Sequence, residues 1–228
     1  MNFFGHAHLA SLELKDPRFI LGATLPDLMT MANRRLSAID DPLIARGVDH
    51  HHDLDRRFHA LPAFTALCSA ALDELPRQGL GRGAARAVGH IGSELLLDGL
   101  LAAQSGAVST YRRALRAALD ERLDAHVVTK AAARARPGAP QSEGDGDLGA
   151  LLSRLATAPI PEAYSDPAFV TSRLLRILAP RPRLAFDPEF APAVTAWLHG
   201  AQRVLEREQS VILSALRPGA SNPLAYRP

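Results

Sequence analysis

The sequence predicts an all-α fold, and three observations support this prediction. Apolar residues recur with helical spacing along nearly the whole chain, and β-branched runs are few. Tight Asn-Gly or Asp-Gly hairpin signals flanked by alternating residues do not occur. With 228 residues, of which 47% are hydrophobic and 22% charged, the chain has the composition of a folded globular protein and can bury a sizeable core. We therefore expect one all-helical domain over residues 1–228.

The periodic segments define the expected elements. Helices are expected over residues 3–14, 17–32, 40–58, 61–76, 81–105, 109–134, 147–157, 167–179 and 189–217. Five prolines lie within two residues of an expected helix start, where the missing N–H is tolerated, namely Pro17, Pro42, Pro62, Pro167 and Pro188. The Gly- and Pro-rich segment at about 136–147 has no apolar pattern and predicts a flexible surface loop. It separates the part with the site from the C-terminal helices.

The first expected helix, 3–14, contains His6 and His8. Because they are two residues apart on a helix they face apart, so at most one is expected to reach a given pocket.

The N-terminus lacks the positive region and the long apolar stretch of a signal peptide. The longest apolar stretches fall short of the roughly 20 residues that span a bilayer. A cytoplasmic protein without membrane partners is therefore expected.

Asp27 closes the apolar stretch of the second helix, directly behind Pro26. Alone it would be an ordinary cap.

In the third expected helix His51, Asp55 and His59 are spaced four residues apart and therefore share one face. His50, His51 and His52 point in different directions, so only one or two of them are expected to be ligands. Cys68, the single cysteine, follows the apolar pattern of the fourth helix and is expected to behave as a small buried hydrophobe.

The fifth expected helix has the most informative pattern. His90, Glu94 and Asp98 fall at i, i+4 and i+8 among apolar residues and therefore share one face. At about 1.5 Å per residue the outer two are about 12 Å apart, so they cannot readily bind one ion. Either two metals are bound or one of the three supports a ligand. Unpaired acids on an apolar helix are costly unless a cation neutralises them.

The basic residues are nearly all arginine, although the formal net charge is only +2, and this balance argues against nucleic acid as a partner. They form the groups Arg56/Arg57, Arg82/Arg86, Arg112/Arg113/Arg116 and Arg173/Arg176/Arg181/Arg183. These groups are either solvated helix faces or contacts for an acidic or phosphorylated partner, since the guanidinium fork suits carboxylate and phosphate.

Histidines and carboxylates without cysteine suit Zn²⁺, Mn²⁺ or Fe, and such ions activate water and neutralise a phosphoryl group. No Gly-x-Ser-x-Gly elbow, phosphate-binding glycine loop or dinucleotide fingerprint is present. The sequence therefore predicts a metal-dependent phosphoester hydrolase. The predicted metal and catalytic residues are Asp27, His51, Asp55, His90, Glu94 and Asp98, together with one of His6 and His8. His52 or His59 would donate a proton to the leaving group, and Arg56 or Arg57 would bind the substrate.

Several segments in order along the chain resemble one known family. They are the opening Met1-Asn2-Phe3-Phe4-Gly5-His6-Ala7-His8-Leu9-Ala10, then Gly22 to Asp27, Gly47-Val48 followed by His51, Asp55 and Pro62, then Glu94 and Asp98, and Arg181-Pro182-Arg183-Leu184. They resemble the acyl carrier protein phosphodiesterases, also called holo-acyl-carrier-protein hydrolases, which have a divergent HD-like helical fold.

The resemblance implies an HD-like helical bundle with extra C-terminal helices. It further implies that the chain removes 4′-phosphopantetheine from holo-acyl carrier protein with a divalent metal, typically Mn²⁺. By this carry-over His6, Asp27, His51, Asp55, Glu94 and Asp98 form the metal and catalytic set. An acidic carrier protein would also give the arginine groups a role. The family usually has aspartate where His59 stands, a polar residue at Leu61 and histidine at Gly99, and these departures concern the substrate more than the metal.

Three alternatives stay open. Gly22 to Asp27 together with His90 and Glu94 also resembles the zinc-dependent phospholipase C and nuclease group. The chain would then be an enzyme of that group, or another HD-type phosphohydrolase, that acts on a different phosphoester. A di-iron oxygenase or lyase on a similar scaffold would show two irons and dioxygen-dependent turnover. A binding protein with an emptied metal site would not gain melting temperature on addition of Mn²⁺ or Zn²⁺.

Overall fold

A computed structural model describes residues 1–131, 148–159 and 161–217 and confirms the all-α class. The main elements are α1 (Phe3–Glu13), α2 (Pro17–Met31), β1 (Arg34–Ile39), α3 (Pro42–His59), α4 (Pro62–Glu74), α5 (Arg82–Ala87), α6 (Ser93–Ala102), α7 (Ala107–Asp120), β2 (Val127–Ala131), α8 (Leu148–Thr157), α9 (Pro167–Leu178) and α10 (Ala191–Leu216). Short helical turns are η1 (Pro76–Gln78), η2 (Val88–Gly92), η3 (Leu123–His126), η4 (Glu162–Ser165) and η5 (Pro188–Phe190). The loop expected over about 136–147 lies outside the described residues.

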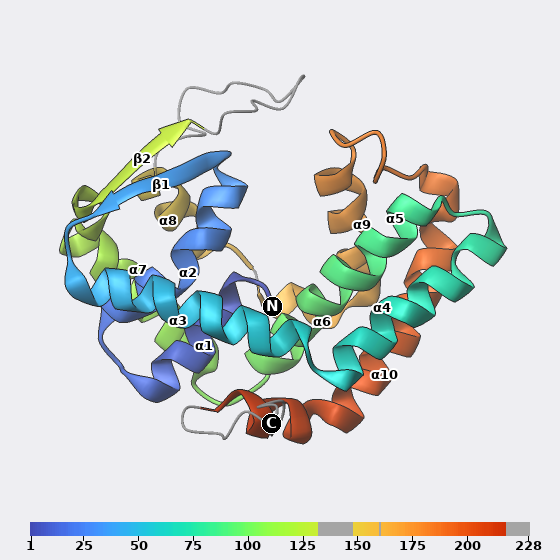
Figure 1. Cartoon of the computed structure of the whole chain (residues 1–228), viewed down its shortest axis with the longest axis horizontal. Coiled ribbons are helices and arrows are strands. Elements are labelled where there is room, and N and C mark those ends of the chain that lie inside the picture. Colours follow the sequence, from blue (N-terminus) through green and yellow to red (C-terminus); the bar gives the residue numbers. More distant parts are fainter. Residues whose placement is uncertain (132–147, 160, 218–228) are drawn as a thin grey trace, which may run out of the picture.

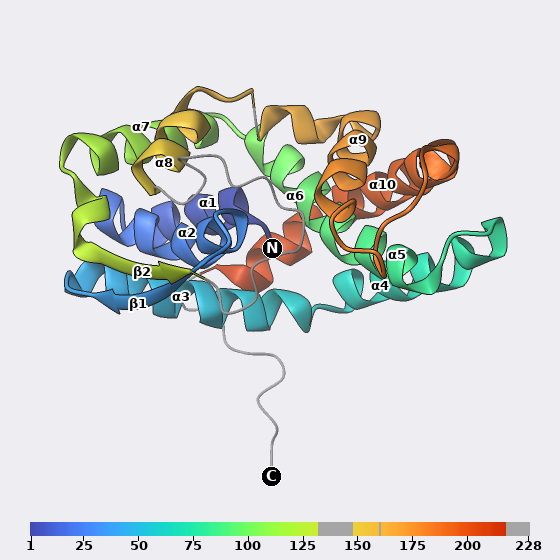
Figure 2. The same ribbon diagram turned by 90° about the horizontal axis from the view of Figure 1, so that it is seen from above.

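The elements are arranged around a central N-terminus (Figure 1). Helices α1, α2, α7 and α8 and the two strands lie on one side of it, and α4, α5, α9 and α10 lie on the other. The long helix α3 runs along one face, as the view from above also shows (Figure 2). The first residues of the chain therefore lie where the two halves meet.

Among the described residues no helix has both the length and the apolar character needed to cross a membrane.

Most of the expected helices begin where the sequence predicts. Pro17, Pro42 and Pro167 follow the N-cap residues Asp16, Asp41 and Asp166, whose carboxylates accept hydrogen bonds from backbone N–H groups of the first turn. Such a cap satisfies donors that have no partner inside the helix. The helix boundaries of α2, α3 and α9 are thus fixed by local chemistry.

Helices α2 and α3 touch through two glycines. A Cβ atom at Gly22 would lie 2.1 Å from the carbonyl oxygen of Ile44, and one at Gly47 would lie 2.3 Å from that of Phe19. Only glycine permits this distance between the backbones. The contact holds the middle of α3 against the middle of α2, and His51, one turn after Gly47, contacts the carbonyl oxygen of Ala23 in α2.

Gly47→Ala is expected to lower the free energy of unfolding by about 1–3 kcal/mol or more, because the added methyl group would force α2 and α3 apart. Thermal or urea unfolding measures the change. Gly200→Ala in α10 is the matched control: nothing lies within 4 Å of its Cβ position, so the same substitution there should stabilise the chain by about 0.5–1 kcal/mol. Equal effects at both positions would contradict the close contact between α2 and α3.

The helix expected over 109–134 is wrong in its last part. Helix α7 ends at Asp120, and residues Val127–Ala131 form β2, which pairs antiparallel with β1. The β-branched residues Val127, Val128 and Thr129 favour this extended conformation. The strands are about 90 residues apart in the sequence, from Arg34 paired with Ala131 to Ile39 paired with Val127. A sheet without a tight turn leaves no hairpin signal in the sequence.

The helix expected over 81–105 is interrupted by a π-helical turn, η2, between α5 and α6. Two glycines of this turn pack closely on neighbouring helices. A Cβ atom at Gly89 would lie 2.6 Å from the Cβ of Ala71, and one at Gly92 would lie 2.8 Å from a methyl group of Leu198. His90 lies in this turn, beside Phe64 of α4 and Glu94 of α6. π-helical turns of this kind are frequent at functional sites.

Candidate metal centre

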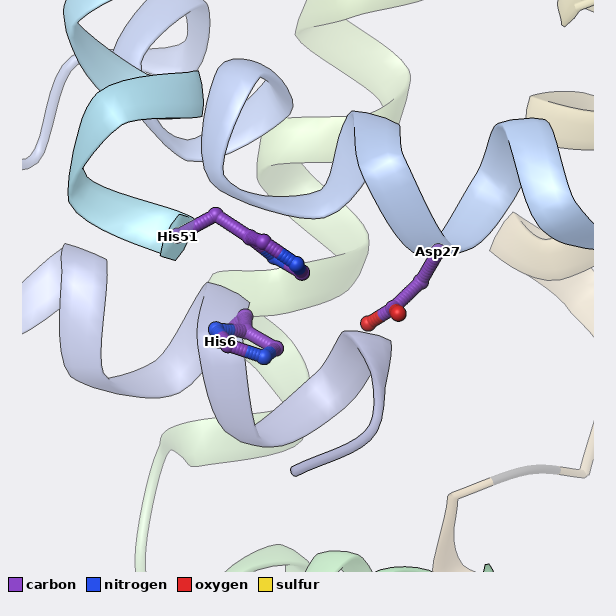
Figure 3. Close-up of side chains that lie close together, drawn as sticks. All are labelled: His6, Asp27 and His51. Carbon is purple, nitrogen blue, oxygen red and sulfur yellow. The ribbon is translucent and has the colours of Figure 1, made fainter. Parts of the chain in front are cut away.

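Three side chains from the first three helices form a buried group. His6 of α1, Asp27 of α2 and His51 of α3 each offer a ligand atom, and these atoms lie within 4.8 Å of one another. Figure 3 shows the three side chains pointing toward one another. His6 and His51 are buried, and their rings stack with centroids 3.8 Å apart. The sequence predicted all three as metal ligands.

Hydrogen bonds to carbonyl groups fix the orientation of both imidazoles. Because a carbonyl oxygen can only accept, His51 donates from Nδ1 to the oxygen of Ala23 at 2.9 Å, and His6 donates from Nε2 to that of Met1 at 3.1 Å. In the neutral imidazoles, Nε2 of His51 and Nδ1 of His6 therefore carry lone pairs. Such an orienting bond on the second nitrogen is the usual arrangement for a metal-binding histidine.

Two atoms of this group are buried without a partner, and a cation would satisfy both. Within the described part of the chain, neither Nδ1 of His6 nor Oδ2 of Asp27 has a hydrogen-bond partner. Asp27 is half-buried as a residue, but this oxygen is inaccessible. Leaving such atoms unpaired costs free energy, and divalent metals are bound by this donor set. The three residues thus fit a divalent metal.

Burial also sets the protonation of the group. It lowers the pKa of His6 to about 4 and that of His51 to about 3, so both imidazoles are neutral at pH 7. Burial raises the pKa of Asp27 well above its usual range. Metal ligands must be deprotonated, and a bound cation would offset the cost of the Asp27 charge.

A second group lies beside the first. His59 of α3, His90 of η2 and Glu94 of α6 also offer ligand atoms within 4.8 Å of one another. Oε1 of Glu94 lies 3.0 Å from Nε2 of His59 and 3.2 Å from Nε2 of His90. The rings of His59 and His90 stack with centroids 4.8 Å apart. This group is half-buried and therefore more accessible than the first.

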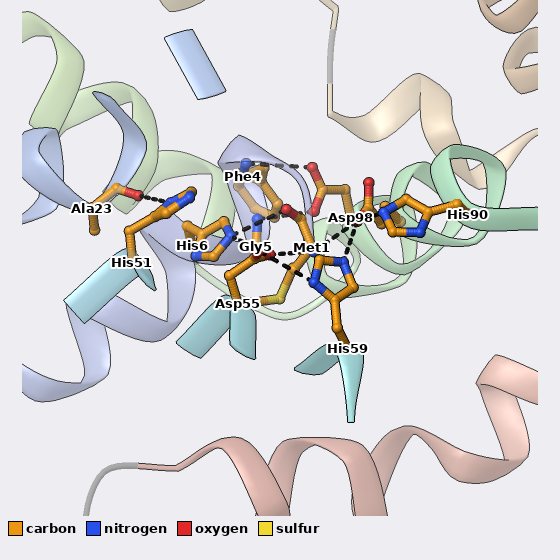
Figure 4. A network of polar contacts seen from close by, with 11 residues as sticks. Met1, Phe4, Gly5, His6, Ala23, His51, Asp55, His59, His90 and Asp98 are labelled. Atoms are coloured by element: carbon orange, nitrogen blue, oxygen red, sulfur yellow. Dashed lines mark hydrogen bonds and ion pairs between the residues drawn. The ribbon is translucent and has the colours of Figure 1, made fainter. Parts of the chain in front are cut away.

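Asp55 connects the two groups (Figure 4). Its Oδ1 lies 3.6 Å from Nε2 of His6, and its Oδ2 lies 3.2 Å from Nδ1 of His59. The α-ammonium group of Met1 lies between the same groups, 3.2 Å from Oδ1 of Asp55 and 3.0 Å from Oε1 of Glu94. Asp55 therefore links the two metal-compatible groups through its contacts with His6 and His59, and each group could hold an ion of its own.

The second group differs from the first in its protonation. Cys68 and Glu94 beside the imidazole raise the pKa of His90 to about 9, and Asp55 and Glu94 raise that of His59. Although burial opposes it, the Met1 α-ammonium and the two histidines hold the pKa of Glu94 below its usual range. At pH 7 without metal, His90 is therefore protonated and its charge is balanced by Glu94.

Metal binding at this second group should depend steeply on pH. Because the pKa of His90 is about 9 and a metal ligand must be neutral, the metal competes with one proton, and its apparent affinity should rise by nearly tenfold per pH unit from about pH 6.5 and more slowly as the pH approaches 9. Calorimetric titration with Mn²⁺ or Zn²⁺ measures this affinity. His90→Gln should remove the dependence. An unchanged affinity of the second ion over this range would argue against His90 as a ligand.

Asp98 belongs to neither group and instead binds the start of α1. Its Oδ1 accepts from the N–H of Gly5 at 2.9 Å, and its Oδ2 accepts from that of Phe4 at 3.3 Å. Burial raises the pKa of Asp98 to about 8. Asp98 thus caps α1 from another helix and places His6, while its assignment as a metal ligand stays a prediction.

The remaining predicted residues lie at the edge of the two groups or away from them. His52 is exposed and its ring contacts that of His51 edge-on. Arg56 is exposed and pairs with Asp53 at 3.1 Å, and Arg57 donates to the carbonyl oxygens of Ala215 and Arg217 near the end of α10. The structure does not bring these two arginines to the metal-compatible groups, and their role in substrate binding stays a prediction.

A cavity of about 610 Å³ opens beside the centre. Asp27 of the first group and Glu94 of the second both line it. Apolar side chains contribute much of the wall, including Phe3, Leu155 and Ile177. The wall also contains four arginines, namely Arg154, Arg173, Arg176 and Arg181. The volume lies in the range of sites for small organic molecules, which is about 300–1,000 Å³.

Sequence reasoning missed three features of this site. The α-ammonium of Met1 is invisible to side-chain patterns, and Cys68 reaches His90 from α4 although its apolar spacing predicts only burial. The meeting of α8 and α9 at the cavity follows from tertiary packing. The arginine groups were the one available signal. No family model, curated protein or solved structure matches this chain.

Proposed function

We propose that this chain is a metal-dependent phosphoesterase. The observation that carries the proposal is the buried His6–Asp27–His51 group, in which two ligand atoms have no partner among the described residues, at the wall of a cavity that also contains arginines. Neutral imidazoles and a carboxylate suit a hard or borderline divalent ion, and such ions neutralise the charge of a phosphoryl group and activate water. An HD-like arrangement of the helices and a cytoplasmic location are part of the same proposal.

The proposed ligands fall into two sets. His6, Asp27 and His51 would hold one ion, and His59, His90 and Glu94 would hold a second, with Asp55 between them. When bound, such ions supply Lewis-acid activation of water and neutralise charge on a phosphoryl group. Mn²⁺ is the first ion to test, because the resemblance to the acyl carrier protein phosphodiesterases implies it, and Zn²⁺ and Fe are the next.

The chain's own groups have separate tasks in this proposal. Asp98 binds the first turn of α1 and so places His6. The carbonyl oxygen of Ala23 in α2 accepts a hydrogen bond from His51 and so orients its ring. His59 lies within reach of two carboxylates that raise its pKa, so it can hold a proton near neutral pH and give it to the leaving oxygen. Since His59 also belongs to the second group, binding of a second ion there and proton donation by His59 exclude each other.

The first substrate to test is holo-acyl carrier protein, because the order of motifs along the chain resembles its phosphodiesterases. Hydrolysis of the ester to serine would release 4′-phosphopantetheine. The experiment is incubation of the Mn²⁺-loaded chain with holo-acyl carrier protein, followed by mass spectrometry of the carrier. We expect the loss of the phosphopantetheine mass. An unchanged carrier, together with hydrolysis of simple phosphodiesters, would keep the reaction class and refute the carrier as substrate.

The reaction class has its own test. The metal-loaded chain should hydrolyse a generic phosphodiester such as bis(p-nitrophenyl) phosphate, and a chelator should stop the reaction. Mn²⁺ or Zn²⁺ should also raise the melting temperature, since a ligand that binds only the native state stabilises it. Metal binding without hydrolysis of the carrier or of any ester in a panel of phosphodiesters and phosphomonoesters would refute the proposed function.

A further inference from the structure

One face of α9 presents a positive surface to the cavity. Arg173, Arg176 and Ile177 are spaced i, i+3 and i+4 and therefore share a face, and all three line the cavity. The other side of the helix is buried through Val170, Leu174 and Leu178, which are all inaccessible. Because this apolar side is buried, the rotation of α9 about its axis is fixed, and both arginines stay on the side of the cavity. The cavity therefore has a fixed basic wall on α9.

Two of these arginines have no internal counter-charge. Within the described ranges neither Arg173 nor Arg176 forms an ion pair with a carboxylate, whereas Arg18, Arg46 and Arg112 do. Arg173 is half-buried and Arg176 is exposed, and the inaccessible Tyr164 lines the same wall. A half-buried guanidinium without a carboxylate partner is a good site for an anion.

The acids of the cavity do not neutralise this wall. Asp27 and Glu94 are the acidic residues that line it, and each belongs to one of the metal-compatible groups. One phosphodiester carries a single negative charge, which the proposed metals would already balance. Two unpaired guanidinium groups suit a further charged group, and a cavity of about 610 Å³ has room for it.

We infer that Arg173 and Arg176 form an anion subsite, which binds a second anionic group of the substrate apart from the phosphoester that is cleaved. The inference rests on the proposed function and names the substrate class: phosphoesters with an additional phosphate or carboxylate. A small ester would supply this group as a terminal phosphate. A carrier protein would supply it as side-chain carboxylates near the modified serine. Arg154 and Arg181 line the same cavity and extend its basic character.

A matched pair of small substrates tests the subsite. Thymidine 5′-(p-nitrophenyl phosphate) has one phosphodiester, and its 3′-phosphorylated form has the same diester and one additional phosphate. We expect a kcat/KM that is higher for the 3′-phosphorylated form by about ten- to a hundredfold, because bonds to charged groups contribute this much. Arg173→Ala/Arg176→Ala should abolish the preference and leave hydrolysis of the simpler diester unchanged. That unchanged rate also shows that the variant is folded.

Control variants and a third substrate complete the test. Arg203→Ala/Arg207→Ala removes the same charge from exposed positions of α10 and should keep the preference. With holo-acyl carrier protein, a loss in the Arg173→Ala/Arg176→Ala variant alone would identify carboxylates as the natural anion. A preference that survives in this variant would overturn the inference, and so would equal rates of the wild-type chain on both thymidine esters.

Failure of the subsite can be told from failure of the proposed function. Binding of inorganic phosphate to the metal-free chain, in the presence of a chelator, does not require hydrolysis. We expect phosphate to raise the melting temperature of the wild-type chain but not of Arg173→Ala/Arg176→Ala. If no ester is hydrolysed but phosphate still binds through these arginines, the subsite stands and the phosphoesterase proposal fails. If esters are hydrolysed but phosphate does not bind there, the inference fails alone.

Discussion

Asp27→Asn should lower the rate of phosphodiester hydrolysis by about a thousandfold or more, because loss of a metal ligand removes several kcal/mol of charge stabilisation from the transition state. The substitution keeps the size of the side chain and removes only its charge. Asp27 lies at the wall of the cavity and its Oδ2 is buried without a partner among the described residues. Steady-state kinetics with bis(p-nitrophenyl) phosphate, together with metal analysis, measures both effects.

The same variant should be at least as stable as the wild-type chain when no metal is present. Burial raises the pKa of Asp27, which means that its charged form costs free energy in the native state. An amide has no such cost, so activity and metal-free stability should change in opposite directions, as they do at many functional sites. A matched control is Asp73→Asn on the exposed side of α4, which should alter neither quantity. Full activity of Asp27→Asn would rule out Asp27 as a ligand.

Asp98→Ala should lower the free energy of unfolding by about 2–6 kcal/mol, because it leaves two buried N–H donors without an acceptor, each at about 1–3 kcal/mol. These donors are the N–H groups of Phe4 and Gly5 in the first turn of α1. Space near them is tight: a Cβ atom at Gly5 would lie 2.9 Å from Oδ1 of Asp98. Chemical denaturation of the metal-free chain gives the value directly.

Asp98→Asn separates the hydrogen bonds from the charge. It keeps one oxygen acceptor and has nearly the same volume, so it should lose much less stability than Asp98→Ala. Since α1 contains His6, the alanine variant should also bind Mn²⁺ more weakly than the asparagine variant. The opposite order, with Asp98→Asn as the more damaging change in metal binding, would instead support Asp98 as a direct ligand.

Local signals account for the helices that the sequence predicts correctly. Helix starts at Pro17, Pro42 and Pro167 combine an aspartate cap with a proline, and both act within one turn. The sheet of β1 and β2 was not predicted, because its pairing joins segments about 90 residues apart. The π-helical turn was missed for a similar reason, since it depends on how Gly89 and Gly92 pack on other helices.

The candidate site shows the same division. The spacing of His90 and Glu94 within one helix predicts that they meet, and they lie 3.2 Å apart. Spacing does not say which residues of different helices come together, such as His6 with Asp27 and His51, or that Asp98 binds the backbone of α1. These contacts depend on the approach of α2 to α3 at their glycines. One sequence contains the residue types but not the tertiary distances.

The π-helical turn at Val88–Gly92 has an evolutionary consequence. Such a turn contains one residue more than the α-helical turn it replaces. Deletion of Ile91 would remove this extra residue, leave a continuous α-helix and shorten the spacing of His90 and Glu94 from four residues to three, which changes the contact that now places them 3.2 Å apart. The first group, on α1, α2 and α3, would be untouched. A single insertion or deletion in this turn can therefore change the geometry of the second group while the ligands of the first stay in place.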